Sequence, residues 1–250
     1  MVALRKLPEL SLRATACLVI LMLGVCTVFG FATRKSFTDY NRDRTKLDAL
    51  PFAVFSQPAE MLAYADNSEA LDSAGVVAVA VCRGRGVYIY QSFLRELEVT
   101  EVLRGEGVEP GDVIDTYDNL AIEEPYNYSG KGQFTSERRV RPAGLGPNIR
   151  GAAPLREGQA YLLFLNKKRD LPEASEPRYV QVHSAYAHVA LDVLEHPERV
   201  RIRGAVPGED GENIPFGEAS DFDAFVSDEA ACRAYLNGCQ QTMASAGLLK

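Results

Sequence analysis

The side chains best suited to recognition lie in one long segment without regular periodicity, residues 119–158. Aromatic and arginine side chains, which are enriched in protein interfaces, alternate through it. The candidate binding residues are Tyr126, Tyr128, Phe134, Arg138, Arg139 and Arg141. Segments of this length without secondary structure are uncommon in compact domains unless they are functional or disordered. The sequence therefore predicts a binding loop, with a disordered insertion as the alternative.

Three of the five cysteines are candidates for a disulfide bridge: Cys82, Cys232 and Cys239. Cys232 and Cys239 are seven residues apart, which on one continuous helix is a rise of about 10.5 Å and beyond disulfide reach. In an oxidising compartment one pair is expected to close. The favoured pairing joins Cys82 to Cys232 or Cys239, and three reduced thiols are the alternative.

The sequence offers few candidates for metal-binding or catalytic residues. The sequence has three histidines and neither a CxxC nor an HExxH pattern, so no metal site is predicted. The pairs Glu96/Glu98 and Glu123/Glu124 have no sign of the differing environments that an acid–base pair requires. No catalytic residue and no cofactor are predicted.

The elements that must position the loop are mostly strands. Residues 94–115 alternate apolar and polar side chains around a glycine-rich turn, which predicts a hairpin at the centre of the fold. Residues 75–83 and 159–167 are apolar on both faces, as in fully buried strands. Residues 178–192 and 198–204 are expected to form an antiparallel pair.

The last segment, 206–250, is acidic and predicted to be helical. Its apolar residues recur at helical spacing, and Ser227 or an aspartate before it could cap the helix. Gly238, which follows Asn237, is expected to end or kink the helix.

The order of these strands, with EVTEVLRG at 98–105, GDVI at 111–114 and PLREGQAYLLFL at 154–165, resembles extracytoplasmic bacterial modules of unknown function. Those modules look like small OB-type barrels of the netrin and metalloproteinase-inhibitor kind. The likeness covers residues 57–205 and implies a fold rather than an activity. The expected fold is mainly β, an OB-like antiparallel barrel followed by a C-terminal helix; an immunoglobulin-like sandwich is the alternative.

The N-terminal region suggests a membrane location. Residues 14–32 contain no charge and follow a short basic tail, 1–13, which together predict a single transmembrane helix with the globular part outside the cytoplasm. A signal peptide cleaved near Ala32 is the alternative. Residues 33–57 are expected to be a juxtamembrane linker, and residues 58–205 the barrel domain.

Charge limits the possible partners. The net charge is −7, and residues 1–46 carry eight Lys/Arg against three Asp/Glu, so the remainder has a net charge of −12. Nucleic-acid binders need a basic surface, so a nucleic-acid partner is not expected. The sequence favours a membrane-anchored, non-enzymatic binding or scaffold module whose loop 119–158 contacts a protein or an envelope polymer. The alternatives are an envelope hydrolase with a site under that loop and a secreted inhibitor-like protein.

Overall fold

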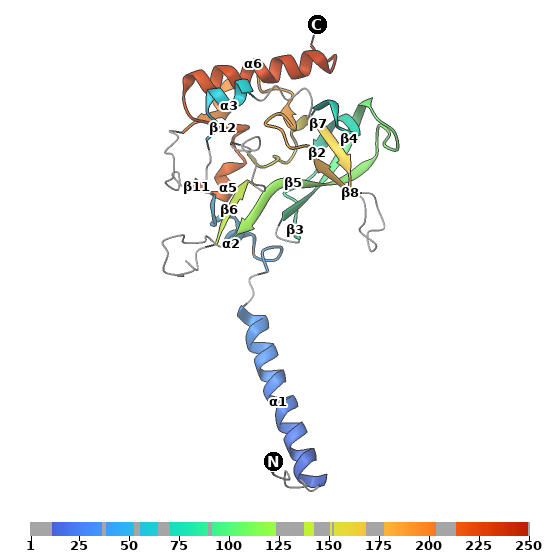
Figure 1. Ribbon diagram of the computed structural model, residues 1–250, viewed down its shortest axis with the longest axis vertical. Coiled ribbons are helices and arrows are strands. Elements are labelled where there is room, and N and C mark those ends of the chain that lie inside the picture. Colours follow the sequence, from blue (N-terminus) through green and yellow to red (C-terminus); the bar gives the residue numbers. More distant parts are fainter. Residues whose placement is uncertain are drawn as a thin grey trace, which may run out of the picture. The chain divides into compact units, whose positions relative to one another are not determined.

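The protein is represented by a computed structural model that divides into two units, 1–43 and 44–250 (Figure 1). The structure describes residues 12–36, 39–52, 56–64, 71–89, 92–123, 138–142, 151, 153–168, 178–203 and 214–249. The first unit contains the helix α1 (Leu12–Ser36), and the second contains all the strands.

The second unit is mainly β. Its strands are β1 (Pro51–Phe52), β2 (Val76–Cys82), β3 (Val87–Ile89), β4 (Ser92–Arg104), β5 (Val113–Glu123), β6 (Arg139–Pro142), β7 (Ala160–Lys167), β8 (Arg178–Gln181), β9 (His188–Ala190), β10 (Val200–Ile202), β11 (Ile214–Pro215) and β12 (Ala224–Val226). Its helices are α2 (Arg44–Asp48), α3 (Ala59–Tyr64), the 3₁₀ turn η2 (Pro197–Arg199), α5 (Phe216–Ala219) and α6 (Glu229–Ser245).

Five strands close into a barrel in the order β2-β4-β5-β8-β7, and β7 pairs back to β2. All neighbouring pairs are antiparallel except β5 and β8, which are parallel. Closure leaves these five strands without a free edge, and the same sheet continues outside the barrel to end strands β3 and β11. The mainly β barrel with a C-terminal helix, expected from the sequence, is confirmed.

The central hairpin is also confirmed, because β4 and β5 pair with Leu97 opposite Ile114. The period-two pattern has the predicted consequence: Leu97 and Val99 are buried, whereas Glu96 and Thr100 are exposed. The two predicted buried strands are β2 and β7, which lie side by side in the barrel.

The predicted pairing of residues 178–192 with residues 198–204 is wrong. The chain turns after β8, at Ser184, and resumes as β9, so the range holds two short strands. Each of these strands pairs with β7. Further along, β10 pairs in parallel with β12 in a separate two-stranded sheet. The partner of each of these short strands depends on packing between segments distant in the sequence, and the local alternation of apolar and polar residues does not encode it.

Part of the expected loop 119–158 is strand rather than loop. β5 extends to Glu123, and β6 pairs with it antiparallel. β6 has alternating burial, with Val140 fully buried between two half-buried arginines, a pattern too short to be recognised as a strand in the sequence. The linker expected at 33–57 is likewise folded in part, since Phe52 of β1 is fully buried and pairs with Val140.

The predicted C-terminal helix is α6, and it lies beside α3 (Figure 1). Its N-cap is Asp228, one residue after the expected Ser227, and its carboxylate accepts a hydrogen bond of 2.8 Å from the backbone N–H of Ala231. Gly238 does not end the helix. It lies directly under the ring of Tyr186, where a Cβ atom would collide with that ring, so glycine here allows close packing.

The helix α1 covers the expected transmembrane segment, residues 14–32. The expectation of a membrane-spanning helix is not met: in the part of the chain that the structure describes, no helix is long and apolar enough to cross a membrane.

Candidate binding site

The residues predicted to bind a partner are only partly described. Tyr126, Tyr128 and Phe134 lie outside the described residues. Arg139 and Arg141 are half-buried on β6, and Arg138 immediately precedes it. None of these three arginines is a free guanidinium, because each interacts with other groups of the protein. The structure therefore ties one end of the predicted loop to the barrel through β5.

A buried ion pair lies on the inward face of the central hairpin. Arg95 of β4 donates from Nε to Oδ2 of Asp118 on β5 at 3.2 Å, and the two side chains are 4% and 0% exposed. Arg95 also donates to the Gly84 carbonyl at 3.4 Å, and the backbone N–H of Leu155 donates to Asp118 at 3.4 Å. These contacts join β4, β5, the β2–β3 turn and the segment before β7.

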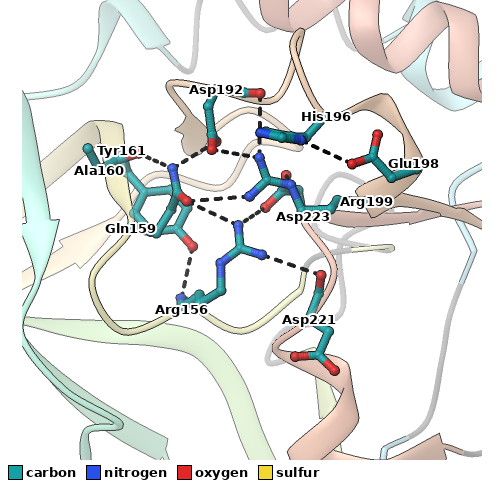
Figure 2. A network of polar contacts seen from close by, with 10 residues as sticks. All are labelled: Arg156, Gln159, Ala160, Tyr161, Asp192, His196, Glu198, Arg199, Asp221 and Asp223. Carbon is teal, nitrogen blue, oxygen red and sulfur yellow. Dashed lines mark hydrogen bonds and ion pairs between the residues drawn. The ribbon is translucent and has the colours of Figure 1, made fainter.

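A second buried carboxylate, Asp223, lies between two arginines (Figure 2). Oδ1 of Asp223 accepts a hydrogen bond of 2.9 Å from Arg156, and Oδ2 lies 3.4 Å from Nε of Arg199. The Asp223 side chain is 2% exposed. Arg156 precedes β7, Arg199 ends η2 and Asp223 precedes β12, so the contacts join segments that are distant in the sequence.

The network continues to a third carboxylate, Asp192. Arg199 forms an ion pair of 2.7 Å with Asp192, and the Gln159 amide donates to the same carboxylate at 2.8 Å (Figure 2). Arg156 donates to Oε1 of Gln159 at 3.2 Å, which closes a ring of polar contacts. At its edge, His196 lies 3.1 Å from the exposed Glu198.

The environments of the two carboxylates shift their pKa values in opposite directions. Burial raises the pKa of Asp223, although the charges of Arg156 and Arg199 act against that shift. Burial also acts to raise the pKa of Asp192, but the hydrogen bond and charge of Arg199 outweigh it, so that pKa is lowered. Both acids are held by arginine, so the arrangement joins segments that are distant in the sequence.

Arg156 and Arg95 also form part of the wall of a pocket of about 130 Å³. The pocket lies between α2, the β2–β3 turn, residues 154–157 and α5. Its charged lining residues are Arg44, Asp48, Arg85, Arg95, Arg156 and Glu157. We call this cavity the arginine pocket.

Two arginines of the arginine pocket come from its rim. Arg44 of α2 donates to the Gly86 carbonyl at 2.7 Å, and Arg85 of the β2–β3 turn forms an ion pair of 2.8 Å with Asp48 of α2. An arginine of α2 thus contacts the turn and an arginine of the turn contacts α2, so two contacts join these elements. The Arg85 side chain is 52% exposed, in contrast to the buried Arg95.

Gly86 fixes the position of this turn. Its φ of +76° is unfavourable for residues with a side chain, and a Cβ atom would lie 2.7 Å from Cδ of Arg95 and 2.8 Å from the Leu94 carbonyl. Glycine at this position therefore allows the backbone to pack directly on the Arg95 side chain. Gly86 thus contacts both Arg95, which we place on the floor of the arginine pocket together with Arg156, and Arg44 at its rim.

The predicted disulfide is not formed, because Cys82, Cys232 and Cys239 are all free thiols. Cys82 instead donates to the carbonyl of Gly84 at 3.3 Å, within its own turn, and Cys239 interacts with Tyr235 on the same helix. Burial raises the pKa of Cys82 and of Cys239, which keeps both as thiols and makes them poor nucleophiles.

The histidines do not form a metal site in the described part of the chain, which holds no group of three or more His, Cys, Asp or Glu side chains around one point. His188 is buried and hydrogen-bonds the Gln181 side chain at 2.8 Å. Burial lowers the pKa of His188, so it is neutral near pH 7.

Sequence reasoning missed the arginine pocket. It assigned Arg44 to the linker 33–57, and no local pattern relates Arg44 to Arg85, which follows 41 positions later. The available signal was weak: Arg95 falls on the apolar face of the hairpin, in phase with Leu97, which marks it as a buried charge that needs a partner.

Comparisons with protein-family models, curated proteins and solved structures found no match for this chain.

Proposed function

We propose that this protein is a non-enzymatic binding module built on an OB-like barrel. The observation that carries the proposal is the strand order. Numbering the barrel strands 1 to 5 along the chain gives the closed order 1-2-3-5-4, with strands 3 and 5 parallel. A five-stranded closed barrel of mostly antiparallel strands suits the OB-type architecture, which binds ligands through one strand face and the neighbouring loops.

The proposed contact surface is β6 together with the flanking chain of the segment 119–158. In the described part, β6 adds a short strand to β5 outside the closed barrel and carries two half-buried arginines. Aromatic residues precede it in the sequence, so the segment combines the side chains that dominate binding energy in interfaces. The partner is a protein or an envelope polymer.

Photo-crosslinking from the loop tests this role. A photoreactive phenylalanine analogue at Tyr128 or Phe134 should crosslink to one partner in cells, and the same analogue at Val87, exposed on the edge strand β3, is the control. Replacing Tyr126, Tyr128 and Phe134 together with serine should abolish capture from a third site, Arg138. Equal crosslinking from Val87 and from the loop would refute the assigned surface.

We also propose that α1 holds the chain at a membrane, with the barrel outside the cytoplasm. Support comes from its apolar side chains, which are exposed on all sides of the helix, among them Ile20 at 69% and Phe29 at 67%. Exposed apolar surface of this extent is typical of membrane or protein interaction sites.

Carbonate extraction of isolated membranes tests the attachment of the chain to the membrane. The full chain should stay with the membrane pellet, and the double variant Leu21→Arg/Leu23→Arg should be released, because charges in an apolar helix disfavour its burial in lipid. The barrel should be digested by protease added outside the inner membrane. Release of the unaltered chain by carbonate would refute attachment, and full protection of the barrel would refute the orientation.

A further inference from the structure

We propose that the arginine pocket binds an oxyanion group, a phosphate or a carboxylate, carried by a small molecule or by a partner. This site goes beyond the role proposed for residues 119–158, because other elements form it: α2, the β2–β3 turn, residues 154–157 and α5.

The rim supplies hydrogen-bond donors in excess. A guanidinium has five N–H donors and no acceptor. Among the contacts of the described residues, the Arg44 guanidinium donates to the Gly86 carbonyl and the Arg85 guanidinium to Asp48, one acceptor group each. Most donors of both arginines therefore remain for a ligand. An oxyanion offers several acceptor oxygens, and arginine binds phosphate and carboxylate groups with paired hydrogen bonds.

The floor is rigid and already neutralised. Arg95 is held by Asp118, and Arg156 by Asp223; Arg95 is already buried and costs almost no further desolvation when a ligand enters, and Arg156, at 23% exposed, costs some. Fixed donors also need little reorganisation on binding, which favours affinity. The attraction for an anion therefore comes from Arg44 and from the unused donors of Arg85, which is paired with Asp48. The carboxylate of Glu157 also lines the pocket and opposes this attraction, and the floor provides orientation.

The size of the arginine pocket limits the group that can enter. A volume of about 130 Å³ exceeds that of a single water site several-fold. A phosphate or carboxylate group fits this space, and the remainder of a larger ligand would extend outside it. Gly217 maintains the opening, because a Cβ atom there would lie 3.1 Å from Cβ of Asp48.

The alternative is that Arg44 and Arg85 only join α2 to the turn. The two explanations predict different results for a matched pair of variants on the same turn. Arg85 lines the arginine pocket, whereas Arg83, two positions earlier, forms an ion pair with Glu98 of β4 and does not line it. Both side chains are about half exposed, at 52% and 47%, so neither substitution should unfold the protein.

Calorimetric titration of the full chain in detergent tests the site, with inorganic phosphate and acetate as probes at constant ionic strength. The unaltered protein should bind phosphate saturably. The double variant Arg44→Gln/Arg85→Gln should bind at least about tenfold more weakly, because charge-assisted hydrogen bonds are lost. Arg83→Gln should bind as the unaltered protein does. Circular dichroism checks the fold, and the single variant Arg85→Gln replaces the double variant if the latter unfolds.

Saturable acetate binding with the same dependence on the variants would support the site and assign it to carboxylates. The proposal is overturned if neither probe saturates at tens of millimolar, or if Arg83→Gln weakens binding as much as the rim variants do. Such a failure would not affect the role of residues 119–158, which the crosslinking from Tyr128 tests separately.

Discussion

Two sets of arginines in the same part of the molecule have different surroundings. Arg95 and Arg156, which are 4% and 23% exposed, are each hydrogen-bonded to a carboxylate that is at most 2% exposed. Arg44 and Arg85 lie at the rim, where each makes one contact with the described residues, and these contacts join α2 to a turn. The difference indicates that burial and the number of partners, not residue type, separate a structural arginine from one available for binding.

The energetic consequences also differ. A buried charge that loses its partner keeps the cost of its desolvation, so removing one member of a buried pair is strongly destabilising. An exposed ion pair contributes little, typically less than about 1 kcal/mol. Variants of the floor should therefore lower stability, and variants of the rim should lower affinity with little loss of stability.

The largest effect is expected at the buried ion pair of the hairpin. Asp118→Ala leaves Arg95 buried without its carboxylate, and should lower the free energy of unfolding by about 3–5 kcal/mol. Urea denaturation followed by circular dichroism measures this. The apolar double variant Arg95→Leu/Asp118→Leu should recover much of the loss, because neither residue then leaves an uncompensated charge. A loss below 1 kcal/mol for Asp118→Ala would contradict a structural role for the floor.

Gly86→Ala should have the next largest effect on stability, and it should disturb both sets of arginines. Alanine would have to adopt the positive φ of this position, which is unfavourable for it, and its methyl group would collide with the Arg95 side chain, so we expect a loss of about 2 kcal/mol of stability. Like the rim variants, it should also weaken phosphate binding, since the turn carries Arg85 and the Gly86 carbonyl accepts a hydrogen bond from Arg44. Gly84→Ala, a position where a Cβ atom would meet nothing within 4 Å, is the matched control.

The polar network should make stability depend on pH in the acid range. The folded pKa of Asp192 is lowered, so its contribution to stability is complete above the unfolded pKa of about 3.9 and is lost as the pH falls through the folded value. Asp192→Asn should therefore show a smaller decrease of the melting temperature from pH 5 to pH 3 than the unaltered protein. Asp221→Asn, whose backbone carbonyl and not its carboxylate contacts Arg156, is the control. Equal pH dependence in all three proteins would refute the contribution of Asp192.

The smallest effect on stability is expected at the rim. Arg85→Gln breaks an exposed ion pair with Asp48, and should cost less than about 1 kcal/mol in urea denaturation. A loss comparable to that of Asp118→Ala would show that the rim is structural and would remove the distinction between the two sets.

The sequence predicts those parts of the fold that depend on local pattern. The alternation around Leu97, the two apolar runs and the helical spacing near the C-terminus lead directly to β4, β2, β7 and α6. The pairing of β5 with β8, the brief strand β6 and the packing of Gly238 under Tyr186 depend on long-range contacts that no local pattern encodes.

The candidate site is less predictable than the fold. Its residues come from α2, the β2–β3 turn, the segment before β7 and α5, and each part looks like ordinary surface in the sequence. The aromatic residues of the predicted loop lie outside the described residues, so that prediction remains to be tested by crosslinking. The predicted disulfide is not formed in the structure, because spacing in the sequence does not show which cysteines meet in the fold; Cys82 and Cys239 instead contact residues of their own turn and helix.

The distinction between the two sets of arginines is tested most directly by the midpoint of urea unfolding, measured with and without inorganic phosphate. A ligand that binds only the folded state stabilises it in proportion to the logarithm of its concentration relative to Kd. The unaltered protein and Arg44→Gln/Arg85→Gln should have similar midpoints without phosphate. Phosphate salts stabilise folded proteins in general, so both midpoints should rise when phosphate is added, and the midpoint of the unaltered protein should rise further. Equal shifts in both proteins, or a midpoint of the double variant as low as that of Asp118→Ala, would contradict the account.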